Sequence, residues 1–354
     1  MKSYENVNGL LDEYMRLGVP GCDCVIYYQG SCIFRRYLGE AVTGKEWYRI
    51  YSCSKLITCV AALMLYEQGM IRLEDPLSMY LDEFKNMKVN TEKGIKKAKH
   101  PITIKNLFCM TAGFSYNLYS PELERCRKET NGRCSTREVM HYLAKEPLLF
   151  EPGERWEYGL CHDVLAAVVE VVSGMRFGTF VREKIFRILG MENSTFLLPE
   201  KEFDKLNRQY YLEEKSGKVL ERDKNNDFQF GYDYESGGAG CVSTTEDYIK
   251  FLEGLRTGKL LRKDTLHLMT TNMLTEEKRG NFWLTEYGYG LGIRCPKKPN
   301  MKMDIGWTGA AGAYAMIDLY RGLSLFYVQH VRSFYTDELR NKLYPALLKD
   351  LGIE

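Results

Sequence analysis

Ser52 and Lys55 stand three residues apart, and these residue types at this spacing could carry out acyl transfer. The apolar run at 56–66 predicts a buried helix, and residues i and i+3 lie on one face of a helix, so the amine should lie beside the hydroxyl. A serine hydroxyl is a weak nucleophile until a neighbouring group takes its proton. A lysine in a partly dry site can take that proton, or it can keep a nearby phenol ionised. The spacing alone also fits a helix start followed by a surface lysine, so other segments must decide.

Two later segments contain groups that could complete such a site. Tyr158 lies in a predicted turn before the apolar run at 162–173, and beside Lys55 its phenol would ionise more easily and could take the proton of Ser52. A packing role is the alternative, because the chain has 25 tyrosines. The small residues at 306–313 allow a ligand to approach the backbone closely, so an N–H group there could form an oxyanion hole with the N–H of Ser52. Such glycines are also typical of a bulge or a barrel corner.

Together these motifs resemble those of a known enzyme superfamily. The order of Ser52-x-x-Lys55, Tyr158 and Trp307-x-Gly309 is similar to that in the β-lactamase and penicillin-binding-protein superfamily of serine hydrolases. The likeness is greatest to its class C β-lactamase branch, with the family VIII esterases. Further blocks of the chain resemble the landmarks of that branch: 18–21, 48–55, 102–107, 110–113, 150–153 and 237–243. Several blocks in the right order are far more specific than any one motif.

The resemblance implies a role for each motif. Ser52 would be the nucleophile that forms an acyl-enzyme, and Lys55 and Tyr158 would share the proton transfer, with the base in acylation left open. The backbone N–H groups of Ser52 and Ala310 would form the oxyanion hole. The third motif would line the substrate site with Trp307, Thr308 and Gly309.

Two departures from the family pattern narrow the substrate. Where the family has Tyr-x-Asn, the chain has Leu160, which offers no hydrogen bond to a substrate amide. Trp307 replaces the usual Lys or His of the third motif, and an indole cannot pair with a substrate carboxylate. Both changes argue against efficient β-lactamase or D-Ala-D-Ala carboxypeptidase activity and favour a neutral, apolar acyl group, and Trp307 resembles the esterase members. Loop tyrosines that could line the site, or simply pack on the surface, are Tyr116, Tyr119, Tyr232 and Tyr234.

The elements that must position these residues follow from hydrophobic periodicity. Strand patterns occur at 24–28, 32–37, 240–243, 290–294, 313–318 and 323–330. Besides the helix that follows Ser52, helix patterns occur at 4–17, 103–110, 136–145, 162–173, 177–189 and 336–351. The basic run at 93–100 is typical of a solvated loop. We therefore expect an α/β (α+β) fold in which residues 1–75 and 236–354 form an antiparallel sheet flanked by helices. Residues 76–235 would be a mainly helical insertion that forms the other wall of an active-site groove.

Composition and charge argue against several other classes of function. The net charge of +2 favours neither a nucleic acid nor a membrane surface as partner, and the longest apolar stretches are too short to cross a bilayer. The first residues lack the layout of a signal peptide, and the eleven cysteines lack metal-binding spacing. We therefore expect a cytoplasmic protein with reduced thiols and with no metal or other cofactor. His162 and Asp163 could form a dyad, but Asp163 at a helix start is more typical of a cap.

The sequence thus predicts a serine hydrolase that cleaves small carboxylic esters through an acyl-enzyme on Ser52. Acyl transfer to another acceptor, or action on D-amino-acid peptides or amides with weak β-lactamase activity, would use the same nucleophile and stays open. A binding module that keeps the fold without catalysis is a further alternative.

Overall fold

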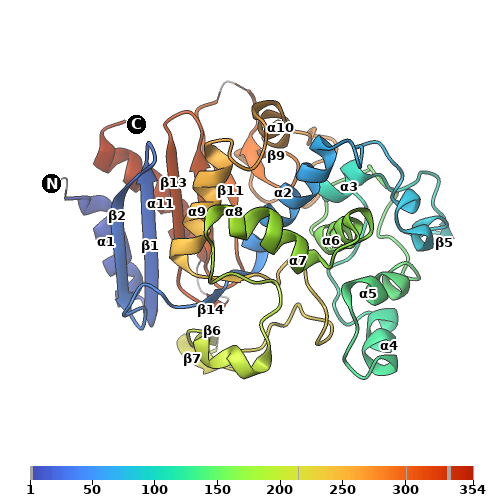
Figure 1. Ribbon diagram of the computed structural model, residues 1–354, viewed down its shortest axis with the longest axis horizontal. Helices are drawn as coiled ribbons and strands as arrows, with labels where there is room; N and C mark the ends of the chain where they lie inside the picture. The colour runs from blue at the N-terminus through green and yellow to red at the C-terminus, as the bar shows by residue number, and fades with distance from the viewer. Residues whose placement is uncertain (1–2, 214, 300, 333–335, 354) are drawn as a thin grey trace.

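A seven-stranded antiparallel sheet forms one side of the molecule in the computed structural model, which describes residues 3–213, 215–299, 301–332 and 336–353 (Figure 1). Its strands, in spatial order, are β2 (Ser31–Gly39), β1 (Gly21–Tyr28), β13 (Leu323–Val328), β12 (Tyr314–Asp318), β11 (Ile305–Thr308), β10 (Arg294–Pro296) and β9 (Tyr287–Tyr289). The first and last parts of the chain meet directly in this sheet, where Ile26 of β1 is the register partner of Leu325 of β13. The predicted α/β fold with an antiparallel sheet is therefore confirmed.

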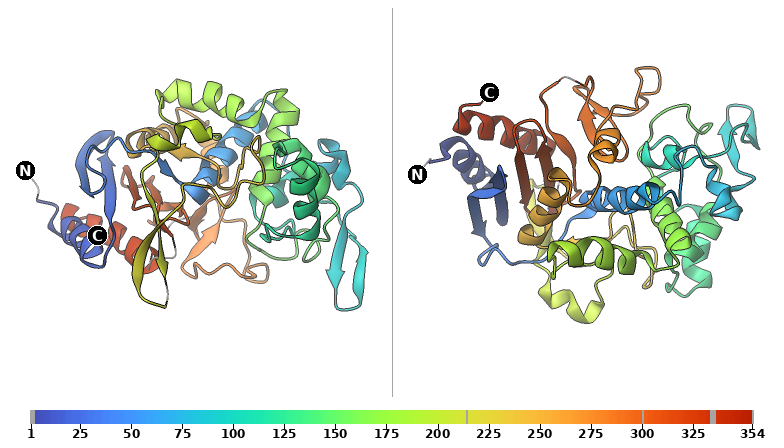
Figure 2. Two further views of the ribbon diagram at one scale, coloured as in Figure 1. Left: turned by 90° about the horizontal axis from the view of Figure 1, so that it is seen from below. Right: turned by 45° about the horizontal axis from the view of Figure 1, so that its top comes forward.

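Helices cover both faces of the sheet (Figures 1 and 2). On one face, α1 (Glu5–Arg16) packs beside α11 (Thr336–Leu351), and on the other, α9 (Thr245–Arg256) packs against β1 and β13. Successive side chains of a strand point to opposite faces, so Leu325 enters the core under α1 while Phe326 enters the core under α9. Because both faces are covered, β13 is buried along its whole length.

The second part of the molecule is built around α2 (Ser54–Glu67), the helix that follows the nucleophile motif. It packs against α6 (Cys161–Ser173), and both helices are apolar on nearly every face, which is typical of helices that are buried on all sides. Shorter helices in this part are α3 (Ile104–Phe108), α4 (Pro121–Glu129), α5 (Thr136–Leu143), α7 (Phe177–Val181) and α8 (Arg187–Leu189). α5 begins with a capping box, in which Ser135 and Glu138 each accept a hydrogen bond from the backbone N–H of the other.

A β-hairpin that hydrophobic periodicity does not predict lies within the region 76–235. Its strands β4 (Lys88–Thr91) and β5 (Gly94–Lys97) project from the body of the molecule (Figure 2). β5 falls in the basic run at 93–100, and every residue of β5 is exposed. The lysines of this run are therefore solvated as expected, although part of the run forms a strand.

A second unpredicted hairpin joins the insertion to the C-terminal region. β6 (Gln209–Glu213) pairs antiparallel with β7 (Lys218–Arg222) and parallel with β14 (Val331–Arg332). A further short pair, β3 (Tyr48–Arg49) with β8 (Val242–Ser243), lies next to the nucleophile segment. The region 76–235 is thus not only helical, and the boundaries of the two proposed parts stay a prediction.

The predicted strand at 290–294 is wrong. Gly290 to Gly292 form a turn between β9 and β10, in which the Gly290 N–H donates to the Ile293 carbonyl at 2.8 Å. Gly292 has a φ of +82°, a conformation that glycine adopts without strain. The alternation of Leu291 and Ile293 resembles a strand because both side chains are buried, but the flanking glycines favour the turn.

Among the described residues, no single helix has the length and apolar composition to cross a bilayer, although α6 with the helical segment Phe177–Leu189 has that composition as a bent pair. All eleven cysteines are free, and ten of them are buried. The prediction of reduced thiols in a cytoplasmic protein stays a prediction.

Candidate active site

Ser52 lies on a single turn of 3-10 helix, Tyr51–Cys53, directly before α2. Tyr51 has a φ of +47°, a left-handed conformation that is costly for a bulky residue. Packing holds Tyr51 there, because its side chain is fully buried and its hydroxyl donates to Gln209. The chain therefore turns sharply into α2, and Ser52 lies at the turn with 8% of its surface exposed.

Lys55 lies in the first turn of α2, and its side chain is fully buried beside the serine. Its Nζ donates to Ser52 Oγ at 3.2 Å, to the Gly238 carbonyl at 2.8 Å and to the Tyr116 hydroxyl at 3.5 Å. The same atom lies 4.6 Å from the centre of the Tyr158 ring. The predicted contact between amine and hydroxyl is confirmed, since positions i and i+3 of the helical path share one face.

Tyr158 comes from the loop before α6, and its hydroxyl meets the serine. It donates to Ser52 Oγ at 2.7 Å and accepts a hydrogen bond from the Trp307 indole N–H at 3.3 Å. Gly159 allows this loop to pack closely, since a Cβ there would lie 2.1 Å from the Phe114 carbonyl oxygen. The predicted convergence of serine, lysine and tyrosine is therefore confirmed.

The groups around Lys55 decide its protonation. Burial by itself would lower the pKa of Lys55, because the interior of a protein disfavours an ammonium ion. Electrostatic attraction to Tyr116, Tyr158 and Asp163 outweighs burial and raises the pKa of Lys55 above its usual value. Lys55 is therefore an ammonium ion at neutral pH.

Aromatic side chains pack around Tyr158. Its ring stacks on Tyr116 and on Trp307, with centroids 5.3 Å and 5.9 Å away. Trp307 is only 2% exposed and contacts the site through Tyr158, and its predicted place in the substrate site stays a prediction. Trp283 meets Tyr158 edge-on at 5.8 Å and is 48% exposed. Trp283 is thus an exposed tryptophan in contact with Tyr158, and no sequence pattern marks this isolated loop residue.

The end of β11 approaches the nucleophile turn closely. A Cβ on Gly309 would lie 2.3 Å from the Ile50 carbonyl oxygen, so only glycine permits this contact. The Gly309 N–H donates to the Ala313 carbonyl at 2.8 Å, which closes a tight loop with Ala310 exposed in it. The third motif therefore lies beside the nucleophile turn, as the resemblance implies. The role of the Ala310 N–H in an oxyanion hole stays a prediction.

Leu160 is buried and lines a cavity of about 180 Å³. Most of the lining is apolar, and it includes Phe114, Leu123, Leu143 and Leu149. Leu160 and Phe114 each stand two positions from a tyrosine of the site, so the cavity and the site are formed by the same two loops.

The chain matches one family model along nearly its whole length. This model, described as Beta-lactamase, matches residues 7–348. The chain belongs to the Beta-lactamase family. The esterase EstB of Burkholderia gladioli is 25% identical over 334 residues, which cover 85% of this chain and 81% of EstB. The acyltransferase mokF of Monascus pilosus is 29% identical over 232 residues, which cover 62% of this chain and 56% of mokF, so the chain spans little more than half of that relative.

A solved structure agrees with the Beta-lactamase assignment. EstCE1, a hydrolase with promiscuous acyltransferase activity, has a TM-score of 0.79 to this chain at 23% identity, and the match covers 96% of this chain and 98% of EstCE1. At this identity the likeness establishes the fold alone. The mixed α/β fold is therefore shared with EstCE1 along nearly the whole chain.

Two predictions about this Beta-lactamase-family site are wrong. Tyr234 does not line a substrate site, because it is buried and its hydroxyl donates to Asp163 at 2.7 Å. Asp163 does not cap α6, because the same carboxylate oxygen accepts from the hydroxyls of Tyr234 and Ser236. His162 contacts Cys59 Sγ at 3.6 Å instead of forming a dyad with Asp163. Two loop tyrosines are exposed on the surface: Tyr119 and Tyr232.

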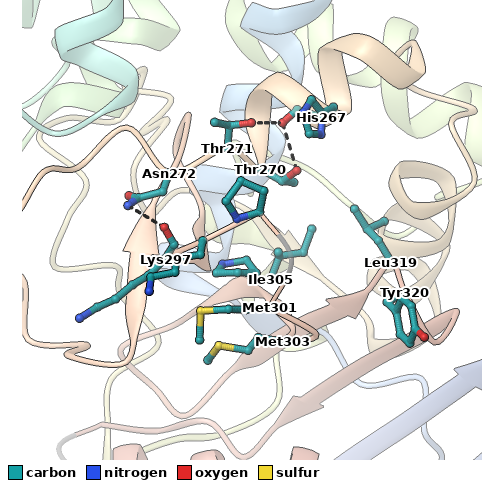
Figure 3. A pocket seen from close by; sticks show the side chains of 13 residues that line it. His267, Thr270, Thr271, Asn272, Lys297, Met301, Met303, Ile305, Leu319 and Tyr320 are labelled. Atoms are coloured by element: carbon teal, nitrogen blue, oxygen red, sulfur yellow. Dashed lines mark hydrogen bonds between the residues drawn. The ribbon is translucent and has the colours of Figure 1, made fainter.

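A second cavity, of about 260 Å³, lies at the opposite end of β11 from the third motif (Figure 3). Ile305, the first residue of β11, lines it. Two polar side chains at this cavity bond to the backbone: Thr271 donates to the His267 carbonyl at 2.8 Å, and Asn272 donates to the Lys297 carbonyl at 3.3 Å. The cavity shares no residue with the serine, lysine and tyrosine of the candidate site.

Proposed function

We propose that the protein is a serine hydrolase that cleaves small carboxylic esters through an acyl-enzyme on Ser52, without a cofactor. The observation that carries the proposal is the position of one hydroxyl between two groups that can handle protons. Ser52 Oγ lies 2.7 Å from the Tyr158 hydroxyl and 3.2 Å from Lys55 Nζ. A serine needs such neighbours to react at neutral pH, and buried surroundings hold them in place before substrate binds.

Tyr158 would be the base in acylation, although the sequence left Lys55 equally possible. The surroundings raise the pKa of Lys55, so this amine keeps its proton, and Tyr158 is the other group within hydrogen-bond distance that can take the proton of Ser52. The Trp307 N–H donates to the same phenol oxygen and would stabilise negative charge on it. The phenolate would accept the proton of Ser52 as Oγ attacks the ester carbonyl carbon.

The remaining steps return every group to its starting state. The tetrahedral oxyanion would be stabilised by the backbone N–H groups of Ser52 and Ala310. The bond to the alcohol then breaks, the alcohol takes the proton from Tyr158, and the acyl group stays on Ser52. Next, a water or a second alcohol gives a proton to Tyr158 and attacks the acyl-enzyme. That proton passes to Ser52 Oγ as the acid or the new ester leaves.

The surroundings of the site favour an uncharged acyl group. Leu160 lines a cavity whose lining is mostly apolar and includes one charged residue, the acid Glu146, and Trp307 offers no cation to a substrate carboxylate. Among the relatives, EstB is an esterase. Acyl transfer to an alcohol is the second candidate function, because mokF is an acyltransferase and EstCE1 has promiscuous acyltransferase activity.

Ser52→Ala tests the proposal directly. It should lower kcat for p-nitrophenyl butyrate by more than about 10⁴-fold, because removing the nucleophile disables the whole unit. Ser194→Ala is the matched control: its hydroxyl contacts Ser243 at 2.8 Å, and it should keep the wild-type rate. Retention of most activity in Ser52→Ala would rule out the mechanism.

Product and adduct analysis separates the candidate functions. A fluorophosphonate probe should add to Ser52 of the wild type, as detected by mass spectrometry. No adduct and no turnover would favour a binding module. Hydrolysis in the presence of a competing alcohol distinguishes an esterase from an acyltransferase, since formation of the new ester alone would show transfer. Nitrocefin and a D-amino-acid amide test the β-lactamase and amidase alternatives in the same assay.

A further inference from the structure

A buried carboxylate lies behind Lys55, and the mechanism above leaves it unused. Asp163 lies in the first turn of α6 and is 1% exposed. Its Oδ1 accepts hydrogen bonds from the Tyr234 hydroxyl at 2.7 Å and from the Ser236 hydroxyl at 2.6 Å. Its Oδ2 is buried and has no hydrogen-bond partner among the residues that the structure describes. A buried charge is costly unless it is compensated, so this oxygen requires a positive charge nearby.

Lys55 supplies that charge across Gly238. A Cβ on Gly238 would lie 2.4 Å from Asp163 Oδ2 and 3.4 Å from Lys55 Nζ, so both atoms lie against the same glycine. They are therefore within about 6 Å of each other, the range over which opposite charges stabilise one another. The Gly238 carbonyl also accepts a hydrogen bond from Nζ at 2.8 Å, and the missing side chain leaves the space between the two charges open.

The other titratable groups around the two charges do not replace Asp163. They are the phenols and thiols of Tyr116, Tyr158, Tyr234, Cys59 and Cys161, together with the imidazole of His162. Burial raises the pKa of Cys59 and of Cys161, and it lowers the pKa of His162 to about 3, so all three are neutral near pH 7. Burial also raises the pKa of Tyr116 and of Tyr234, so these two phenols keep their protons near pH 7.

We infer that Asp163 is a positioning residue for acyl transfer, whose carboxylate keeps Lys55 protonated so that Lys55 can hold Tyr158 as the base. The inference rests on the proposed function and deepens it. Tyr234 and Ser236 fix the carboxylate, and Ser236 is itself fixed because its hydroxyl accepts from the Ala239 N–H at 3.0 Å. The two hydroxyls thus hold the carboxylate in place against Gly238, next to the lysine.

Asp163→Asn removes the charge and keeps an oxygen that can accept from both hydroxyls. With p-nitrophenyl butyrate, kcat should fall about tenfold or more while KM changes little, because the base and not the substrate contact is affected. The alkaline limb of the kcat–pH profile should move to lower pH by at least about one unit, because the ammonium ion loses its nearest carboxylate. A limb that overlays the wild type would overturn the inference.

Asp247→Asn is the matched control. Asp247 is a second buried carboxylate, which accepts from the Asn193 N–H at 2.7 Å and pairs with Lys250 at 3.1 Å. The same chemical change there should leave the pH profile as in the wild type. A shift of the alkaline limb in Asp247→Asn equal to that in Asp163→Asn would overturn the inference, since any buried carboxylate would then have the effect.

Two further variants keep the test decisive if Asp163→Asn does not fold. Tyr234→Phe and Ser236→Ala each remove one hydrogen bond from Oδ1 and keep the charge, so each should shift the limb in the same direction by a smaller amount. Wild-type profiles in both would overturn the inference. Ser52→Ala in the same assay separates the two proposals: activity in Ser52→Ala would refute the proposed function, whereas an inactive Ser52→Ala beside an unaltered Asp163→Asn would refute this inference alone.

Discussion

Among the residues that the structure describes, Arg294 and Lys55 are buried cations in similar surroundings, and of these two only Lys55 lies beside a nucleophile. Arg294 and Lys55 are each almost fully buried, and each lies close to two tyrosine rings and one aspartate. Burying an unpaired charge lowers the stability of the fold by about 3–5 kcal/mol, so an acid is expected near each cation. The two sites differ in the groups toward which the phenols and the carboxylate point.

At Arg294 the polar groups point at one another. The guanidinium forms an ion pair with Asp304, whose carboxylate also accepts from Tyr287 at 2.5 Å and from Tyr314 at 3.3 Å. These contacts occupy both carboxylate oxygens. They also join β9, β10 and β12 to the segment before β11, so the role of this site is structural.

At Lys55 the carboxylate of Asp163 forms no direct ion pair with the amine, and the phenol of Tyr158 bonds to Ser52. Asp163 lies behind Gly238, and its Oδ1 is taken by other hydroxyls. Tyr158 therefore donates to Ser52 and not to an acid. The difference indicates when a buried cation can take part in catalysis. Its counter-ion must be close enough to stabilise it but must not accept the hydrogen bond of the phenol that contacts the nucleophile.

Of the variants at the two sites, Tyr158→Phe should have the largest effect on kcat. It removes the hydroxyl that lies 2.7 Å from Ser52 Oγ and keeps the ring that stacks on Tyr116. The value of kcat for p-nitrophenyl butyrate should fall by about 10²–10⁴-fold, the usual contribution of a general acid–base. Tyr314→Phe makes the same change at the arginine site and should leave kcat unaltered. Equal losses of kcat in the two variants would show that the sites do not differ in role.

Asp304→Asn should destabilise the fold at the arginine site and leave the catalytic rate unchanged. It removes the counter-ion of a buried guanidinium, so the free energy of unfolding in urea should fall by about 3–5 kcal/mol. The rate per active site, counted with a fluorophosphonate, should equal that of the wild type, because the Asp304 carboxylate bonds to Arg294, Tyr287 and Tyr314 and not to the reactive groups. A pH profile shifted like that expected for Asp163→Asn would mean that the arginine site also controls the catalytic lysine.

The three reactive residues could be predicted because each carries its own chemistry in a local context. Ser52 and Lys55 are three residues apart before an apolar helix, and Tyr158 precedes another. Asp163 could not be assigned in this way, because an acid at a helix start is typical of a cap. Its actual partner Tyr234 lies 71 residues further along the chain, and only the folded loop brings the two together.

For the fold as well, the elements with a clear apolar pattern could be predicted from the sequence, and those without one could not. β1 and β13 are buried, apolar runs, so periodicity predicts them. The hairpin of β4 and β5 is largely exposed and polar, so its sequence has no alternating apolar pattern. The pairing between the two strands stabilises it. The turn at 290–292 reads as part of a strand in the sequence, because the alternate buried residues Leu291 and Ile293 have the period of a strand.

Trp307→Phe should lower kcat the least, and it tests the contribution of a single hydrogen bond to Tyr158. It removes the N–H that donates to the Tyr158 oxygen at 3.3 Å and keeps an aromatic ring for stacking. Loss of one hydrogen bond of this kind costs about 0.5–1.5 kcal/mol, so kcat should fall by about 2- to 10-fold. Trp156→Phe is the matched control, because Trp156 also stacks on Tyr158 but its N–H has no hydrogen-bond partner among the described residues. If the two variants lose the same activity, the ring and not the N–H supports Tyr158, and the phenolate would depend on Lys55 alone.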